Sequence, residues 1–357
     1  MPNVLFATNR QPLPDAPAGT MEFGDTALPQ APDALLCGTA VVTDIDISQP
    51  DAGTIERLSG PTRGGFTEAD LAPVLASQND ILVFVHGAEN SFTDAIGRAA
   101  YNKEWLGQGN VPGVSGEFDV IAFTWPGRSY VVANIVGDYI DYRHDQTQAA
   151  ASAFHFGLFI AQMQALRARI GKRRMHLLCH SMGNYMLGGA VEMLFRGGAA
   201  PATPLFDEVV LAAADEVSTT FTAPNGGRLA NLWRLGREIT VYYNNDDIMM
   251  ALSHLANQDY RLGYDGPPNA ADTGFFSTNV YEFVNCTGVN DYISGEVDRS
   301  HQYYRQSPTV RTDILATLGG VTPVRRSYDA AANVYALFPP VVVAAANGAG
   351  DVAGKDG

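Results

Sequence analysis

The segment Arg174-Met-His-Leu-Leu-Cys-His180-Ser181-Met182-Gly183-Asn184 decides how this chain is expected to fold. Its apolar residues predict a buried strand that ends at a serine, and the small residues that follow predict a helix. This strand-to-helix turn, a nucleophile elbow, holds a serine Oγ clear of the sheet and aims the next backbone N–H groups at the reacting centre. The usual pattern is Gly-x-Ser-x-Gly, and Cys179 stands in place of the first glycine, where a side chain crowds the turn. The alternative is an ordinary strand–turn–helix joint.

Apolar runs on both sides of this segment alternate with amphipathic stretches. Near-continuous apolar strands are expected where helices cover both faces of a sheet. The alternation therefore predicts the α/β class, with a doubly wound, mainly parallel sheet and helices on both faces. The expected strands are Ile81–Val85, Val120–Thr124, Met175–Cys179, Val209–Ala213, Ile239–Tyr243 and Val280–Val284, and the expected helices are Thr93–Leu106, Gln146–Arg169, Asn184–Phe195 and Asp247–Ala256.

The domain organisation follows from length and composition. With 357 residues, 46% hydrophobic and 17% charged, the chain can bury one large core. One domain is expected over residues 1–335, with leading strands and loops to residue 75, a catalytic core over 76–305 and a closing helix and loop over 306–335. Thr39–Ile45 is the best candidate for an antiparallel leading strand, and the Ala- and Gly-rich residues 336–357 are expected to form a flexible tail.

Composition also excludes several classes of function. A formal charge of −15 opposes nucleic-acid binding, which relies on clustered Lys and Arg. The three cysteines, Cys37, Cys179 and Cys286, have neither an even count nor metal-type spacing, so no disulfide framework, zinc site or other metal is expected. No phosphate or dinucleotide glycine loop is found, so no cofactor is implied. The sequence lacks both an integral membrane segment and a signal peptide, which predicts a cytoplasmic protein unless a leader was removed.

A serine hydroxyl needs a base to become a nucleophile, normally a histidine oriented by a carboxylate. After a nucleophile elbow, the order along the chain is serine, acid, histidine. Only His254 and His301 follow Ser181. His254 falls within a predicted helix, whereas His301 lies in a polar loop after the last predicted strand. His301 is therefore the expected base, against the alternative of a surface histidine.

The expected acid is Asp246, which with Asp247 follows the strand Ile239–Tyr243. Site residues of parallel sheets gather at this carboxyl edge. Asp247 is one alternative. Asp215, at the end of the preceding strand, is another, since some lipases carry the acid one strand earlier. The unused aspartates would then cap the following helices.

Two backbone N–H groups are expected to form an oxyanion hole. One belongs to Met182, directly after the nucleophile, and the other to Ala88, in the loop after the strand Ile81–Val85. That loop has the His-Gly form seen in many lipases, at His86-Gly87. No substrate-binding residue is assigned. The aromatic segments Gly127–Asp145 and Gln258–Ser277 are expected to provide an apolar pocket wall.

With these residues in place, the chain resembles the bacterial α/β-hydrolases known as the domain-of-unknown-function 900 family. Seven motifs between residue 4 and about residue 305 carry the resemblance: Phe6-Ala-Thr-Asn-Arg10, Phe84-Val-His-Gly-Ala-Glu-Asn-Ser-Phe92, Phe123-Thr-Trp-Pro-Gly127, His180-Ser-Met-Gly183, Leu211-Ala-Ala-Ala-Asp215, Tyr242-Tyr-Asn-Asn-Asp246 with Ala251-Leu-Ser253, and Ser300-His-Gln-Tyr-Tyr304. The sequence departs from the family at Ala214, usually proline, and in an acidic motif stretched by Asp247-Ile-Met-Met250. The resemblance implies an α/β-hydrolase fold with Ser181, His301 and Asp246 in the triad.

The residues together predict a serine hydrolase that cleaves carboxylic esters through an acyl-enzyme on Ser181. The partner would be a small-molecule or polymeric ester; neither the acyl length nor the oligomeric state follows from the sequence. Two alternatives remain open: an acyltransferase using the same triad, and a hydrolase-like binding module without catalysis.

Overall fold

The computed structural model describes residues 2–13, 22–49, 53–128, 135–222, 227–296 and 298–338, with only the backbone of 135–139. Its main feature is an eleven-stranded sheet in the order β12-β13-β11-β10-β9-β8-β6-β7-β1-β4-β5. A separate two-stranded sheet pairs β2 with β3. The strands are β1 (Asn3–Thr8), β2 (Arg10–Pro12), β3 (Phe23–Ala27), β4 (Leu36–Thr43), β5 (Thr54–Arg63), β6 (Asp80–Val85), β7 (Phe118–Thr124), β8 (Met175–His180), β9 (Phe206–Ala212), β10 (Gly236–Tyr243), β11 (Tyr281–Asn285), β12 (Arg326–Asp329) and β13 (Val334–Leu337).

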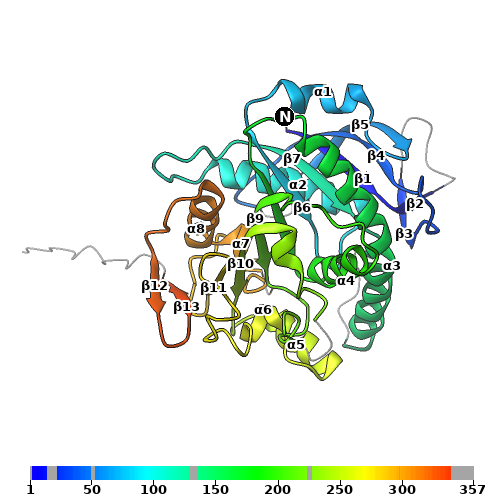
Figure 1. Ribbon diagram of the computed structural model, residues 1–357. Coiled ribbons are helices and arrows are strands. Elements are labelled where there is room, and N and C mark those ends of the chain that lie inside the picture. Colours follow the sequence, from blue (N-terminus) through cyan, green and yellow to red (C-terminus); the bar gives the residue numbers. More distant parts are fainter. Residues whose placement is uncertain are drawn as a thin grey trace, which may run out of the picture.

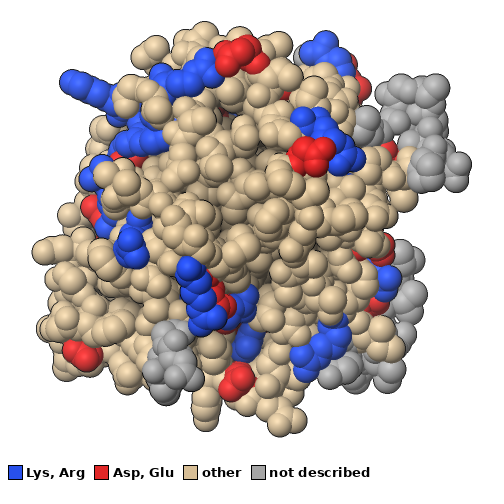
Figure 2. All heavy atoms as spheres, turned by 45° about the vertical axis from the view of Figure 1, so that its right-hand side comes forward, with Lys and Arg blue, Asp and Glu red and all other residues tan. Residues whose placement is uncertain are grey.

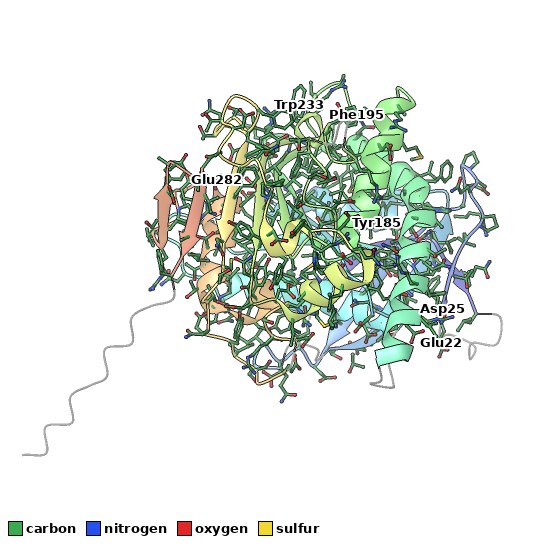
Figure 3. The ribbon with its side chains drawn as sticks, turned by 90° about the horizontal axis from the view of Figure 1, so that it is seen from below. Glu22, Asp25, Tyr185, Phe195, Trp233 and Glu282 are labelled. Carbon is green, nitrogen blue, oxygen red and sulfur yellow. The ribbon has the colours of Figure 1, made fainter. Side chains whose placement is uncertain are left out.

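The centre of the large sheet is parallel, from β1 through β7, β6, β8, β9 and β10 to β11 and β13. Antiparallel pairs occur only toward its two ends, where β4 pairs with β1 and β5, and β12 pairs with β13. The predicted doubly wound, mainly parallel sheet is thus confirmed, and each of the six expected strands is present. Seen from below in Figure 3, Glu22 and Asp25 lie at one end of the molecule and Glu282, on β11, lies toward the other.

Helices cover both faces of this sheet (Figure 1). One buried cluster joins the sheet to α3 and α4 through Phe156, Phe159 and Leu187, and the other joins it to α2 and α8 through Ile96 and Ile314. The helices are α1 (Glu68–Ala76), α2 (Phe92–Gly107), α3 (Ile135–Arg167), α4 (Gly183–Arg196), α5 (Ile248–Asn257), α6 (Leu262–Asp265), α7 (Tyr303–Gln306) and α8 (Pro308–Gly319).

Two boundaries differ from the expectation. Helix α3 begins at Ile135, well before the expected Gln146, so much of the expected connection Gly127–Asp145 is helical. Charged residues between 138 and 145 interrupt the apolar pattern there and hid the helix. At the other end, Ala336 of the expected tail pairs with Asn285 and Ser327 within the sheet. The rest of that tail, residues 339–357, lies outside the described residues.

Helix α3 also bears on the expectation that no segment spans a membrane. Within the described residues, its part Ile140–Arg167 is the one stretch long and apolar enough to do so by length and composition. Half of its apolar window is buried inside the structure, as in a core helix packed on a sheet. Figure 2, which brings this side of the molecule forward, shows few and scattered charged side chains.

Candidate active site

Ser181 occupies a tight turn between β8 and α4. Its φ of +52° places it in the left-handed region, which is uncommon for a residue with a side chain and is often retained at functional sites. Backbone bonds fix the turn, because Ser181 N donates to Ala212 O at 3.0 Å and Asp215 N donates to Ser181 O at 3.1 Å. The sharp strand-to-helix turn expected from the sequence is therefore present.

The crowding expected from Cys179 is relieved by the glycine two residues after the serine. Cys179 is fully buried in β8. A Cβ added at Gly183 would lie 2.6 Å from His86 O and 3.3 Å from Cys179 Sγ. The turn therefore depends on glycine at position 183 and accommodates a side chain at position 179.

His301 lies against Ser181. Its Nε2 is 3.0 Å from Ser181 Oγ, and its Nδ1 is 2.8 Å from Asp247 Oδ2. All three residues are nearly inaccessible to solvent. The loop before α7 places the histidine, since His301 N donates to Asp298 O at 2.7 Å. The structure thus forms a continuous hydrogen-bonded series of serine, histidine and carboxylate.

The carboxylate beside His301 belongs to Asp247, not to Asp246 as first expected. Asp247 is the N-cap of α5: its Oδ1 accepts from Met249 N and Met250 N, which leaves Oδ2 for His301. Asp246 is exposed and accepts from Gly288 N at 3.1 Å. The expected acid is therefore corrected to the alternative Asp247, which caps a helix and orients the histidine at once.

The other alternative, Asp215, has its own partners. It follows β9 and forms a buried ion pair with Arg261. Tyr142 Oη donates to its Oδ2 and Ser253 Oγ donates to its Oδ1. Asp215 lines the same pocket as Ser181 without bonding to His301, so it belongs to the pocket wall.

The electrostatics around His301 favour its protonated form. Burial alone would lower the pKa of this imidazole, but the charge and hydrogen bond of Asp247 outweigh burial and raise the pKa above 6.5. Asp298 and Asp215 add to the rise. The histidine is thus strengthened as a base for the serine proton.

The loop after β6 lies close to Ser181. His86 stacks on Trp125, accepts from Trp125 N at its Nε2 and therefore donates from Nδ1 to Gly87 O at 2.7 Å. Burial holds the pKa of His86 well below its ordinary value, so the ring stays neutral. Ala88 follows in this loop and lines the pocket with Ser181. Within the described part of the chain, the backbone N–H groups of Ala88 and Met182 have no hydrogen-bond acceptor.

Sequence reasoning assigned no role to two residues that hold this loop. Buried Arg10 donates from Nη2 to Asn90 O at 2.7 Å and from Nη1 to Gly127 O at 3.0 Å. Asp145 Oδ2 accepts from Glu89 N at 2.9 Å. The motif Phe6-Ala-Thr-Asn-Arg10, shared with the family that the chain resembles, was the one available signal for Arg10.

Gly87 allows this loop to approach the serine. A Cβ at this position would lie 2.7 Å from Ser181 Cβ and 3.0 Å from His180 Nδ1. We expect Gly87→Ala to displace Ser181 and to lower kcat/KM for an ester by about 10²-fold, because small displacements of reacting groups are costly. Gly295→Ala is the matched control, since no atom lies within 4 Å of a Cβ there. Equal kinetics in the two variants would contradict the close approach.

A pocket of about 170 Å³ opens over Ser181. It is lined by Ala88, Glu89, Arg98, Tyr142, His180, Ser181, Asp215, Met249, Met250, Ser253, Asp298, His301 and Gln302. Of the two expected aromatic walls, Gly127–Asp145 contributes Tyr142, while Tyr130 and the side chain of Tyr139 lie outside the described part. None of Gln258–Ser277 lines the pocket, and Phe276 packs in the core. Of the expected aromatic residues that the structure describes, Tyr142 alone therefore lines the pocket, beside the apolar side chains of Ala88, Met249 and Met250.

Among the residues that the structure describes, no group of three or more His, Cys, Asp or Glu side chains is arranged to hold a metal ion. The site's polar atoms are instead arranged around the serine. This arrangement can accept a proton from Ser181 at His301.

Comparisons with solved structures give distant similarities. The product of gene lin2722 of Listeria innocua shares 12% identity over 73% of this chain and 99% of its own, with a TM-score of 0.36. RedJ shares 15% identity over 69% of this chain and 90% of its own, with a TM-score of 0.33. Phospholipase PlaB of Legionella pneumophila shares 14% identity over 59% of this chain and 38% of its own, with a TM-score of 0.25. No curated protein matches the sequence. TM-scores this low support no conclusion about function.

The family comparison is more extensive. A sequence model described as "Alpha/beta hydrolase of unknown function (DUF900)" matches residues 67–318, from α1 into α8. The match contains β6, the elbow and the loop of His301. The chain belongs to this family of α/β-hydrolases.

Proposed function

We propose that this protein is a serine hydrolase that cleaves carboxylic esters through an acyl-enzyme on Ser181. The observation that carries the proposal is the pair of contacts at His301, 3.0 Å to Ser181 Oγ and 2.8 Å to Asp247 Oδ2. A serine, an imidazole and a buried carboxylate in this order activate the hydroxyl for acyl transfer. Family membership supports a hydrolase fold and leaves the substrate open.

In the proposed reaction, Ser181 Oγ attacks the ester carbonyl carbon while its proton passes to His301 Nε2. The negative charge on the carbonyl oxygen is stabilised by the N–H groups of Met182 and Ala88, and the charge on the imidazolium by Asp247. The intermediate collapses when the C–O bond to the alcohol breaks and His301 gives the alkoxide its proton. Water then attacks the acyl-enzyme by the same route, which returns Ser181 and releases the acid.

The pH dependence of the reaction follows from His301. Catalysis requires the neutral imidazole, and Asp247 raises the pKa of this group above 6.5. We therefore expect kcat/KM to rise with pH through an apparent pKa above 6.5. Rates of hydrolysis of a neutral ester between pH 5 and 9 measure this apparent pKa. A rise of kcat/KM centred below pH 6 would contradict the assignment of His301 as the base.

A fluorophosphonate probe tests the proposal most directly. Such a probe forms a P–O bond to an activated serine and releases fluoride, which intact-protein mass detects as a single adduct. The native protein is expected to gain one adduct, and Ser181→Ala and His301→Ala none. An adduct on Ser181→Ala, or none on the native protein, would overturn the proposal.

A further inference from the structure

The walls of the Ser181 pocket carry more acidic than basic groups. Among the described lining residues, Glu89, Asp215 and Asp298 are carboxylates, and Arg98 is the one guanidinium. Asp247 adds a further carboxylate directly behind His301. An acidic pocket in a chain of formal charge −15 creates a negative potential at the place where a substrate enters.

These carboxylates differ in how far their charge is compensated. Asp215 is paired with Arg261 and accepts hydrogen bonds from two hydroxyl groups, so its charge is largely neutralised. Asp298 accepts from Gln302 Nε2 at 3.1 Å, a neutral donor that leaves its charge in place. Asp298 and Glu89 therefore supply most of the charge that a substrate meets.

Glu89 is held at the mouth of the pocket by its backbone. Its φ of +60° is uncommon for a residue with a side chain, and its N–H is fixed by Asp145 Oδ2 at 2.9 Å. Its carboxyl group accepts no hydrogen bond from any residue that the structure describes. Burial of the carboxyl group raises the pKa of Glu89 to about 7, although nearby His301 and Arg98 oppose the rise. At pH 8 the group is mostly ionised.

The size of the pocket limits the substrate that it can hold. Its volume of about 170 Å³ is smaller than the ~300 Å³ or more typical of ligand sites. The pocket therefore favours a small substrate.

We infer that this site is selective for small esters without negative charge, and that Glu89 and Asp298 exclude anionic esters. The inference rests on the proposed function, because it concerns what reaches Ser181. A like charge near each carboxylate, at the intermediate dielectric of a protein surface, is expected to lower kcat/KM about tenfold.

Three acetate esters of similar size test the charge preference at pH 8. They are 3,3-dimethylbutyl acetate, 2-(trimethylammonio)ethyl acetate and 2-sulfonatoethyl acetate, which are neutral, cationic and anionic. The native protein is expected to hydrolyse the anionic ester at least tenfold less efficiently than the neutral one. Glu89→Gln and Asp298→Asn are each expected to reduce this ratio severalfold, while Glu56→Gln, an exposed change on β5, leaves it unaltered. A native ratio near one, or a ratio that neither pocket variant moves, would overturn the inference.

A second measurement separates this inference from the proposed function. Neutral and anionic aryl phosphonates modify an activated serine without any need for deacylation, and intact mass gives both rates. Modification of Ser181 at equal rates would overturn the charge preference and leave the serine hydrolase intact. No modification by either probe would overturn the proposed function itself.

The size limit has its own test. A series of 4-nitrophenyl esters from two to twelve carbons keeps the leaving group constant. We expect kcat/KM to fall at least tenfold beyond about six carbons. A flat or rising series would overturn the size limit.

Discussion

Replacing Ser181 by alanine is expected to lower kcat for ester hydrolysis by about 10⁶-fold. Removing a nucleophile that acts with a base and two N–H donors loses the whole acyl-enzyme route, and comparable triads lose about this much. A residual rate of about 10³–10⁴ over water is expected, because the oxyanion donors and the pocket remain. The measurement is single-turnover hydrolysis of a short 4-nitrophenyl ester at pH 8.

The matched control for this change lies in the same pocket. Ser253 is also buried, but its Oγ donates to Asp215 and does not contact His301. We expect Ser253→Ala to keep fluorophosphonate labelling and to change kcat by no more than about tenfold. Comparable losses of kcat in the two serine variants would contradict the proposal that Ser181 is the nucleophile.

The fold was largely predictable because the strands β6 to β11 are nearly continuous apolar runs. Their ends differ from the expected ones by three residues or fewer. Such runs report burial on both faces of a sheet, which is a local property of the sequence. Helix α3 shows the limit of this reasoning. Its first turns carry charged residues that interrupt the apolar pattern, so the sequence did not predict that the helix begins there.

The site was predictable where chain order constrains it. Ser181 and His301 follow from the elbow and from the order serine, acid, histidine. Asp246 and Asp247 could not be separated, because adjacent residues after a strand point in different directions and the choice depends on where α5 begins. Arg10 and Asp145 reach the loop of Gly87 from distant parts of the chain, and no local pattern encodes such contacts.

The adjacent aspartates also provide the sharpest comparison within the triad. Asp247→Asn is expected to lower kcat/KM by about 10⁴-fold, because the amide no longer stabilises the imidazolium and favours the wrong tautomer of His301. Loss of the carboxylate also removes the main cause that raises the pKa of His301, so the acidic limb of the pH profile is expected to move to lower pH. The asparagine Oδ1 can still accept from Met249 N and Met250 N, so the cap of α5 is retained.

Asp246→Asn, one residue earlier, removes a charge of the same size from an exposed side chain that contacts Gly288 N, and we expect kcat/KM to change less than threefold. Circular dichroism and thermal unfolding of both variants check that they fold. The assignment of Asp247 would be contradicted by equal losses in the two variants, or by a larger loss in Asp246→Asn, because only one of these carboxylates lies beside His301.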